Sequence, residues 1–582
     1  MSAKRSARTK TRTQATLITT SVPPAEFPVS AWLRKHSLSM FFVLVAIGSL
    51  RIISTYSVLS HTFDEPAHIA CGMEWLAQGT WQYEAEHPPL ARVAAALGPY
   101  LASGRPHTLP TMAQLGLANL GVKKMWDSGL AILYQDGQYD RRLALARLGI
   151  LPFFWIASLV VYLWVRKYVD ELAAVLAVFF FTFLPPILAH AGLATTDMAL
   201  TAFAGATFLA ALTWLANPSW LGSVLLGTTT ALAILSKFSS LLFIPMALIA
   251  ALIWYFAADR PGLWTALRNI RKYLLPLFLA VLTSLLIIWA GYRFSFGPVP
   301  SLASIQLPAP ELFTGIQEVR EHNRNGAQSY LLGEHSQTGW WYFYLVVLAV
   351  KTPIPLLILM LSGIVLVIHK KDLGSSYRGA ALALAFSLGI LLFAMTGHIN
   401  LGVRHILPVY IGFSIVAAVG AARLLALSQA KKWAGWLLFG LMIWMAGSSL
   451  AIHPDYLSYF NVLAGEEPAN VLSDSDLDWG QDLKRLARRL KEVGAPSVAF
   501  ISFAPADLAA MGFPPFQPTS PVNPLEGWNA VSLSVLKNRR MGLDNMRPDI
   551  VPWPERTQPG ERIGKGIWLW YFPPSNAPPR SN

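Results

Sequence analysis

The chain has 582 residues, of which 54% are hydrophobic and only 13% are charged, and its mean hydropathy is +0.43. Soluble domains carry about a quarter of charged residues, so this composition excludes an ordinary soluble protein and indicates several membrane spans. The net charge of +14 sits largely beside apolar runs, without a basic stripe or a known binding motif, which argues against nucleic acid as a partner.

Residues 1–36 are basic and rich in Ser and Thr, and predict a disordered cytoplasmic tail. A multi-span domain is predicted over residues 37–452. At a minimum length of about 17 residues per span, the apolar runs predict about eleven spans. They lie near residues 38–58, 147–165, 171–190, 198–216, 220–236, 238–257, 273–292, 353–369, 377–396, 405–425 and 433–452.

Two long non-spanning loops are predicted, at residues 59–146 and 293–338, and LARVAAALGPYLAS (90–103) in the first predicts an amphipathic helix on the membrane surface. The orientation follows from the short connections on the other side, which are basic and therefore predicted to be cytoplasmic. The sequence therefore predicts a multi-pass protein of the plasma (inner) membrane, with a cytoplasmic N-terminus and with both loops and the C-terminus on the external side. The basic residues are Arg166 and Lys167; Arg260, Arg268, Arg271 and Lys272; His369, Lys370 and Lys371; and Lys431 and Lys432.

Residues 453–582 are soluble in character and predict a small external α/β domain. QDLKRLARRLKEVG predicts a helix ending at Gly494, and SVAFISF and IGKGIWLWYF predict strands. The stretch DSDLDWGQD (474–482) imitates a calcium loop, but Trp479 replaces the required Gly and Arg485 the required Glu. These acids are instead predicted to cap the helix that follows them.

Three acids are the candidate catalytic residues. Asp64 and Glu65 lie side by side in HTFDEPAH, just after the first span, where ionisable groups at a membrane face suggest function. A solvated acidic loop is the alternative. Asp197 in LATTDMAL begins a later span on the same side, with helix capping by Thr195, Thr196 or Asp197 as its alternative.

His87 in EAEHPPL and four basic residues at external span ends are candidates for substrate binding. His87 has the alternative of a stiff turn whose ring caps the next helix. The cations would suit a lipid phosphate, Arg by bidentate bonding and Lys as a point charge, although each could also merely snorkel. They are Arg404 and His405 in GVRHILPVY, Lys237 in LSKFSS and Lys351 in VKTPIP.

The order FDE, then HPPL, then an acid heading a later span resembles the protein O-mannosyltransferase and aminoarabinose-transferase superfamily. YLLGEHSQTGWWYFYLVVLAVKTPIPLL (330–357) and DSDLDWGQDLKRL (474–486) resemble a bacterial branch of it, and the resemblance covers roughly residues 38–490. It implies the C-type membrane fold and transfer of a sugar from a polyprenyl-phosphate donor. In place of the Arg-Tyr pair that mannosyltransferases carry before the second acid, this chain has Ala194-Thr195-Thr196, which leaves the sugar open.

The resemblance implies that Asp64 is the catalytic base, that Glu65 completes the acidic pair and that Asp197 is the second acid. An acceptor hydroxyl would attack the anomeric carbon with inversion, while Arg404 with Lys237 or Lys351 stabilises the leaving phosphate. The acceptor, whether protein, lipid or glycan, stays open. So does a divalent metal ion shared by the carboxylates and His87, for which the ligand set is incomplete. A secondary transporter or lipid flippase is the alternative function, and a non-catalytic scaffold is a third.

Overall fold

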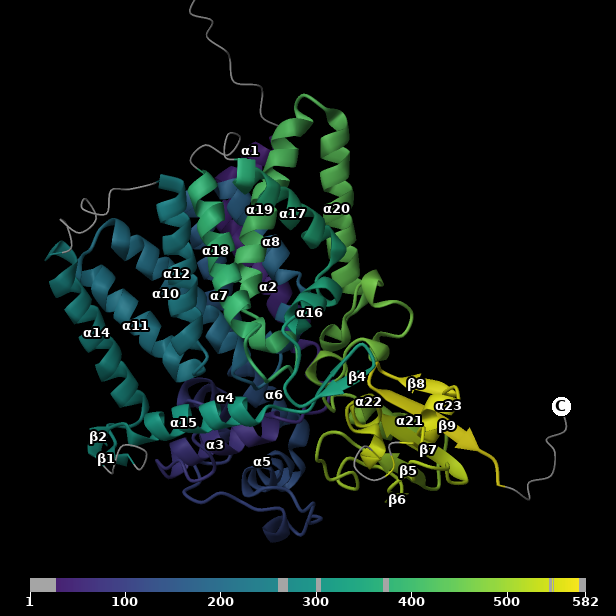
Figure 1. Ribbon diagram of the computed structural model, residues 1–582. Helices are drawn as coiled ribbons and strands as arrows, with labels where there is room; N and C mark the ends of the chain where they lie inside the picture. The colour runs from purple at the N-terminus through teal and green to yellow at the C-terminus, as the bar shows by residue number, and fades with distance from the viewer. Residues whose placement is uncertain are drawn as a thin grey trace, which may run out of the picture.

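The computed structural model describes residues 28–259, 271–299, 305–369, 376–543, 547 and 549–574. Long helices form a bundle, and a small α/β domain formed by the last part of the chain is attached at one end of it (Figure 1). The predicted fold class, an α-helical polytopic membrane protein with a C-terminal α/β domain, is therefore confirmed.

Apolar stretches form the helices of the bundle, because a helix satisfies its backbone hydrogen bonds without water. Their bounds are α2 (Ser37–Ile53), α7 (Leu151–Tyr168), α8 (Glu171–Thr182), α9 (Pro185–Ala191), α10 (Asp197–Ala216), α11 (Trp220–Ser236), α12 (Ser240–Asp259), α14 (Arg271–Gly291), α16 (Phe343–Lys351), α17 (Ile354–His369), α18 (Ser376–Ala394), α19 (Val409–Ser428) and α20 (Lys432–Ala451).

Within the described residues, seven helices are long and apolar enough to cross a membrane, or up to nine if each of two bent pairs counts as one span. In these pairs, α8 and α9 meet at 66° and α16 and α17 at 116°. Pro185 and Pro353 stand at the two breaks, where proline does not continue a helix. The shorter apolar helices α2 and α11 coincide with the predicted spans at 38–58 and 220–236.

Both long loops fold at the end of the bundle that carries the α/β domain (Figure 1). The amphipathic helix predicted within residues 90–103 is α4, and α6 begins inside the predicted loop and leads into α7. The first loop contains α3 (Glu65–Ala77), α4 (Pro89–Ala102), α5 (Lys124–Tyr134) and α6 (Tyr139–Leu148). The second contains β1 (Phe296–Val299), β2 (Ile305–Pro308), α15 (Pro310–Asn325), β3 (Ser329–Leu331) and β4 (Glu334–Ser336).

The N-terminal tail was predicted to be disordered over residues 1–36. Residues 1–27 of it lie outside the described residues, whereas Pro28–Lys35 forms helix α1. The prediction is therefore wrong for this last part. A proline at the first position is compatible with a helix start, because the missing N–H would have no partner inside the helix.

The C-terminal domain is a five-stranded sheet in the order β6-β5-β7-β9-β8, with β5 parallel to β6 and β7 and the other pairs antiparallel. Helix α21 packs on it through apolar residues three and four positions apart, namely Leu483, Leu486, Ala487 and Leu490. The predicted helix and the two predicted strands are confirmed as α21, β5 and β9. The bounds are α21 (Leu483–Glu492), β5 (Val498–Ile501), β6 (Phe516–Gln517), β7 (Gly527–Ser532), α22 (Leu533–Arg539), α23 (Trp553–Arg556), β8 (Glu561–Ile563) and β9 (Ile567–Phe572).

Asp482 precedes α21, but its side chain makes no capping hydrogen bond, which corrects the predicted capping role of this acid. The carboxylate is buried and accepts hydrogen bonds from the backbone N–H groups of Lys565 (3.1 Å) and Gly566 (3.0 Å). Burial raises its pKa to about 7, although nearby Arg485 lowers it. Asp482 therefore ties the start of α21 to the turn before β9, while its Oδ1 accepts a hydrogen bond from Arg485 Nη1 within α21 at 2.9 Å.

This raised pKa predicts that stability falls with rising pH. The protonated form stabilises the fold fully below the unfolded pKa of about 3.9, and that contribution is lost as pH rises through about 7. We expect the apparent unfolding temperature of the protein in detergent to decrease from pH 5 to pH 7 and to level off above it. Asp482→Asn should flatten this dependence by up to about 1.4 kcal/mol per pH unit. An unchanged dependence in the variant would contradict the assignment to Asp482.

Candidate active site

Asp64 stands at the start of α3, between the first bundle helix and the loop helices. Its side chain makes no capping hydrogen bond; instead Oδ2 accepts one from Arg404 Nη1 at 3.0 Å. The Asp64 side chain is 24% exposed and that of Arg404 is 11% exposed. Arg404 lies in the short 3-10 helix η4 (Val403–Ile406), just before α19. The solvated-loop alternative for Asp64 therefore fails, because the carboxylate faces a buried guanidinium.

Asp197 joins the same cluster from the first residue of α10. Its Oδ1 accepts a hydrogen bond from Lys237 Nζ at 2.6 Å, and its Oδ2 lies 4.0 Å from Arg404 Nη1. The residue before it, Thr196, makes no side-chain cap, so the capping alternative is not supported. Arg404 thus lies between two carboxylates, and Lys237 adds a second positive charge. Four of the predicted residues, from four separate parts of the chain, are brought together.

Two histidines border this cluster with an unpartnered nitrogen each. His405 follows Arg404, and its Nε2 is buried without a hydrogen-bond partner among the described residues. Burial, reinforced by Lys237 and Arg404, holds the pKa of His405 well below its usual range, so its ring is neutral and can donate one hydrogen bond. His190, near the end of α9, has a buried, unpartnered Nδ1 in the same described region, and α9 contacts both α10 and η4, which carry Asp197 and Arg404. Sequence reasoning missed His190, whose only signal was its position after the Pro185-Pro186 break.

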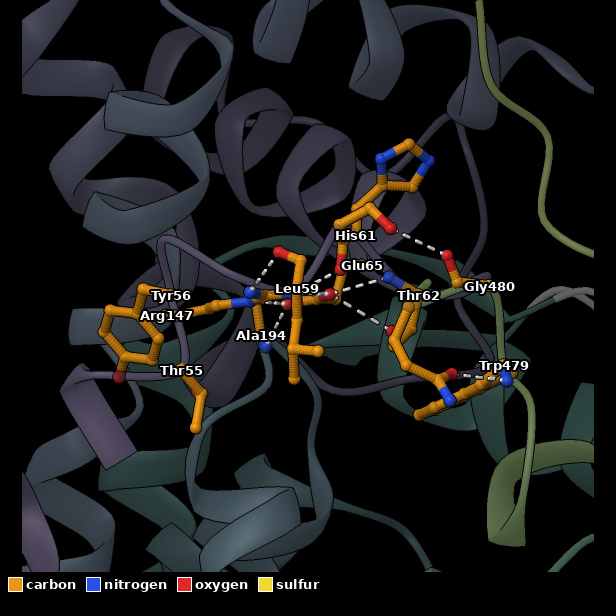
Figure 2. Close-up of polar contacts among 12 residues, drawn as sticks. Thr55, Tyr56, Leu59, His61, Thr62, Glu65, Arg147, Ala194, Trp479 and Gly480 are labelled. Atoms are coloured by element: carbon orange, nitrogen blue, oxygen red, sulfur yellow. Dashed lines mark hydrogen bonds and ion pairs between the residues drawn. The ribbon is translucent and has the colours of Figure 1, made fainter. Parts of the chain in front are cut away.

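Glu65 faces away from the cluster and is completely buried. Its carboxylate forms a two-point ion pair with Arg147, with Nε–Oε1 and Nη2–Oε2 distances of 2.8 Å each (Figure 2). Burial alone would raise the pKa of Glu65, but Arg147 and backbone donors lower it below its usual value. The same pair bonds four backbone groups: Thr62 N (2.8 Å) and Ala194 N (2.9 Å) donate to Glu65, and Leu59 O (3.2 Å) and Ser60 O (2.7 Å) accept from Arg147.

These bonds use both oxygens of Glu65, so the carboxylate is not available to substrate or to a metal ion shared with Asp197. Glu65 instead fixes the loop that ends at Asp64 to the turn that leads to Asp197. The geometry favours a positioning role over a catalytic one. Arg147, its partner, was not singled out from the sequence because it stood at the start of an apolar run, where arginines are common.

His87 does not cap α4, because its ring Nδ1 bonds Glu84 Oε1 at 2.9 Å. Glu84 is also paired with Arg92, and Glu86 bonds His322 at 2.5 Å. Glu84, Glu86 and His87 are the group of described residues that could hold a metal ion, with ligand atoms within 4.8 Å of one another. Their present partners already neutralise both carboxylates, so a cation would have to displace Arg92 or His322.

Lys351 ends α16 and is buried apart from the Arg404 cluster. Its Nζ donates to the backbone carbonyls of Leu457 (2.7 Å) and Asp476 (2.6 Å) and lies 4.0 Å from Asp476 Oδ1. The structure therefore gives Lys351 a role in holding the chain between α20 and α21. The predicted contact with a lipid phosphate is not favoured, and Lys237 is the lysine of the cluster.

A known protein family matches the part of the chain that contains several residues of this site. Residues 146–267 match the family model described as "Dolichyl-phosphate-mannose-protein mannosyltransferase", a stretch that contains Arg147, Asp197 and Lys237. The predicted resemblance is thereby confirmed over residues 146–267. A comparison with curated protein sequences gives no match.

Among solved structures, the chain is similar to ArnT from Cupriavidus metallidurans in the apo state (14% identity, TM-score 0.48, covering 93% of this chain and 98% of that chain). ArnT bound to undecaprenyl phosphate gives 12% identity and a TM-score of 0.47, covering 91% and 97%. The archaeal oligosaccharyltransferase AglB from Archaeoglobus fulgidus, in complex with an inhibitory peptide and a dolichol-phosphate, gives 13% and 0.42, covering 72% and 56%.

Proposed function

We propose that this protein is a membrane glycosyltransferase that moves a sugar from a polyprenyl-phosphate donor to an acceptor hydroxyl, with Asp64 as general base. The observation that carries the proposal is the cluster in which Arg404 lies 3.0 Å from Asp64 and Lys237 lies 2.6 Å from Asp197. A partly exposed carboxylate bonded to Arg404, with Lys237 held on the neighbouring Asp197, offers both a proton acceptor and a site for a phosphate.

In the proposed reaction, the acceptor oxygen attacks the anomeric carbon while Asp64 takes its proton. The bond between the anomeric carbon and the phosphate oxygen breaks on the opposite face, which inverts the anomeric configuration. The electron pair leaves with the polyprenyl phosphate, and its negative charge is stabilised by Arg404 and Lys237. Asp197 holds Lys237 and faces Arg404, so it sets the position of both cations.

The neutral ring of His405 and the ring of His190 would donate hydrogen bonds to the phosphate or sugar. Both rings have a buried nitrogen without a partner among the described residues, and such atoms call for a ligand. The rings of His87 and His68 are in contact, with 5.1 Å between their centroids. His87 would lie on the loop side of the site, where it bonds Glu84, which in turn is paired with Arg92.

The site is proposed to face the exterior. Helices α14 and α20 begin with Arg271–Lys272 and Lys432 at the end of the bundle opposite the loops and the C-terminal domain (Figure 1). Basic residues mark the cytoplasmic side, so the loops and Asp64 would lie outside, where a lipid-linked donor meets external protein, lipid or glycan acceptors.

A transporter or flippase would place its key acids near the middle of the spans. Asp64 lies outside every described helix that could span a membrane, and Asp197 is the first residue of its helix. This favours surface chemistry over passage through the bundle.

Donor turnover tests the proposal. Purified protein in nanodiscs would be given radiolabelled polyprenyl-phosphate sugars with a membrane and periplasmic extract, and Asp64→Asn protein would serve as matched control. We expect label to leave the lipid and to appear on an acceptor only with the wild type. Consumption of nucleotide sugars in place of lipid-linked ones, or movement of the intact donor between leaflets, would overturn the proposal.

A further inference from the structure

The stretch DSDLDWGQD, residues 474–482, is here called the acidic segment. It joins the end of the bundle to the C-terminal domain, and most of it is inaccessible to solvent despite its charge. The buried members are Ser475, Asp476, Leu477, Asp478, Trp479, Gly480, Gln481 and Asp482. Burying this many acids is costly unless each has a defined partner, so the segment must serve contacts that outweigh the cost.

One set of contacts runs along the loop that carries Asp64. The Phe63 N–H donates to the Trp479 carbonyl at 2.9 Å, and Phe63 directly precedes Asp64. Three residues earlier, the Ser60 N–H donates to the Gln481 carbonyl at 2.9 Å, and Ser60 Oγ donates to the Gly480 carbonyl at 2.9 Å. Trp479 and Gly480 lie beside this loop in Figure 2. The acidic segment therefore fixes the backbone on which Asp64 stands.

A second set of contacts holds Arg404. Its guanidinium lies 4.4 Å from the centre of the Trp479 ring, and its Nε donates to Ser475 Oγ at 3.2 Å. Just before it, the Val403 N–H donates to Asp476 Oδ1 at 3.1 Å. One face and one edge of the planar guanidinium are thus occupied by the acidic segment, which leaves Nη1 directed at Asp64.

A third set anchors the acidic segment to the C-terminal sheet. Asp478 accepts hydrogen bonds from the hydroxyl of Ser532 and from the Ser534 N–H (3.2 Å), where β7 passes into α22. Asp482 binds the turn before β9, as described above. The C-terminal domain, the base and the phosphate-binding arginine are therefore connected through a single buried segment.

We propose that the acidic segment is part of the catalytic centre, with Trp479 and Ser475 as positioning residues that hold Arg404 opposite Asp64. The C-terminal domain thereby sets the geometry of the donor-phosphate site. This inference rests on the proposed function, because it takes Arg404 to be the residue that binds the donor phosphate. A domain that merely packed on the bundle would need neither the ring under Arg404 nor the serine at its Nε.

Binding of undecaprenyl phosphate to protein in nanodiscs tests the inference without turnover. Trp479→Leu removes the aromatic face, and we expect binding to weaken by about 3- to 30-fold, with kcat reduced to a similar extent and the KM for the acceptor unchanged. Trp479→Phe should restore most of the binding, because it keeps a ring under the guanidinium. Ser475→Ala, a smaller change that preserves packing, should weaken binding by about 3- to 10-fold.

Trp553→Leu is the matched control, because Trp553 is a buried tryptophan of the same domain that contacts Trp570 and Ser520 instead of Arg404. It should lower the yield of folded protein and leave binding per folded molecule unchanged. The inference fails if Trp479→Leu and Ser475→Ala bind undecaprenyl phosphate like the wild type while Arg404→Ala does not. If the wild type itself does not bind undecaprenyl phosphate, the proposed function fails instead.

Discussion

Replacing Asp64 by asparagine should lower the rate of sugar transfer by about 10²–10⁴-fold, the range that general-base catalysis contributes. The amide keeps the shape of the carboxylate and can still accept the hydrogen bond that Arg404 Nη1 now donates at 3.0 Å. It cannot take the proton of an acceptor hydroxyl at neutral pH. The measurement is initial transfer rate at saturating donor, with undecaprenyl phosphate binding measured on the same preparation.

Asp140→Asn provides the control for this prediction, because Asp140 is an acid of the same loop whose side chain is 71% exposed and pairs with Lys484 at 2.7 Å. It should retain the wild-type rate. Asp64→Asn should retain donor binding, since Arg404 and Lys237 remain in place. If folded, donor-binding Asp64→Asn protein transferred sugar at a rate within about threefold of the wild type, Asp64 would not be the base. The alternative of a transporter or flippase would then be favoured.

Much of the fold could be predicted from the sequence, because apolar runs and proline breaks act locally. Apolar runs long enough to cross a bilayer must form helices. Once the direction of each span is known, the charged residues at the external span ends are expected at the same membrane face. This logic selected Asp64, Asp197, Lys237 and Arg404 without any knowledge of their contacts. It could not predict the pairs, because Asp64 and Arg404 are 340 residues apart in the chain.

The neighbours Asp64 and Glu65 illustrate what local reasoning cannot resolve. Successive residues at the start of a helix point in different directions, about 100° apart at 3.6 residues per turn. One therefore faces Arg404 and the other faces Arg147, and nothing in HTFDEPAH indicates which residue takes which partner. The order of the two acids alone does not separate a base from a structural ion pair.

The acidic segment and Lys351 were misjudged for a related reason. A row of acids before a helix suggests capping, and a lysine beside an apolar run suggests a membrane interface. In the structure, distant parts of the chain surround both: Asp476 bonds Val403 N–H, and its backbone carbonyl accepts from Lys351. Burial of this kind depends on tertiary packing, which neither residue type nor spacing reports.

Removing one member of the Glu65–Arg147 pair should destabilise the protein by about 3–5 kcal/mol, because a buried charge is left without its partner. Both side chains are 0% exposed, so water cannot replace the lost contact. We expect Glu65→Ala and Arg147→Ala to show a strongly reduced unfolding temperature in detergent and low activity through loss of the folded site. Asp140→Ala, which removes an exposed carboxylate from its pair with Lys484, should change stability by no more than about 1 kcal/mol.

The double variant, Glu65→Leu with Arg147→Met, distinguishes two roles of this pair. Replacing a buried ion pair by apolar residues of similar size is often neutral. Here the pair also satisfies the Thr62 and Ala194 N–H groups and the Leu59 and Ser60 carbonyls, which apolar side chains would leave buried and unbonded. We therefore expect the double variant to be about as unstable as either single variant. Recovery of wild-type stability would mean that the single variants are unstable only because a buried charge is left unpaired, and that Glu65 does not hold the Asp64 loop to the turn leading to Asp197.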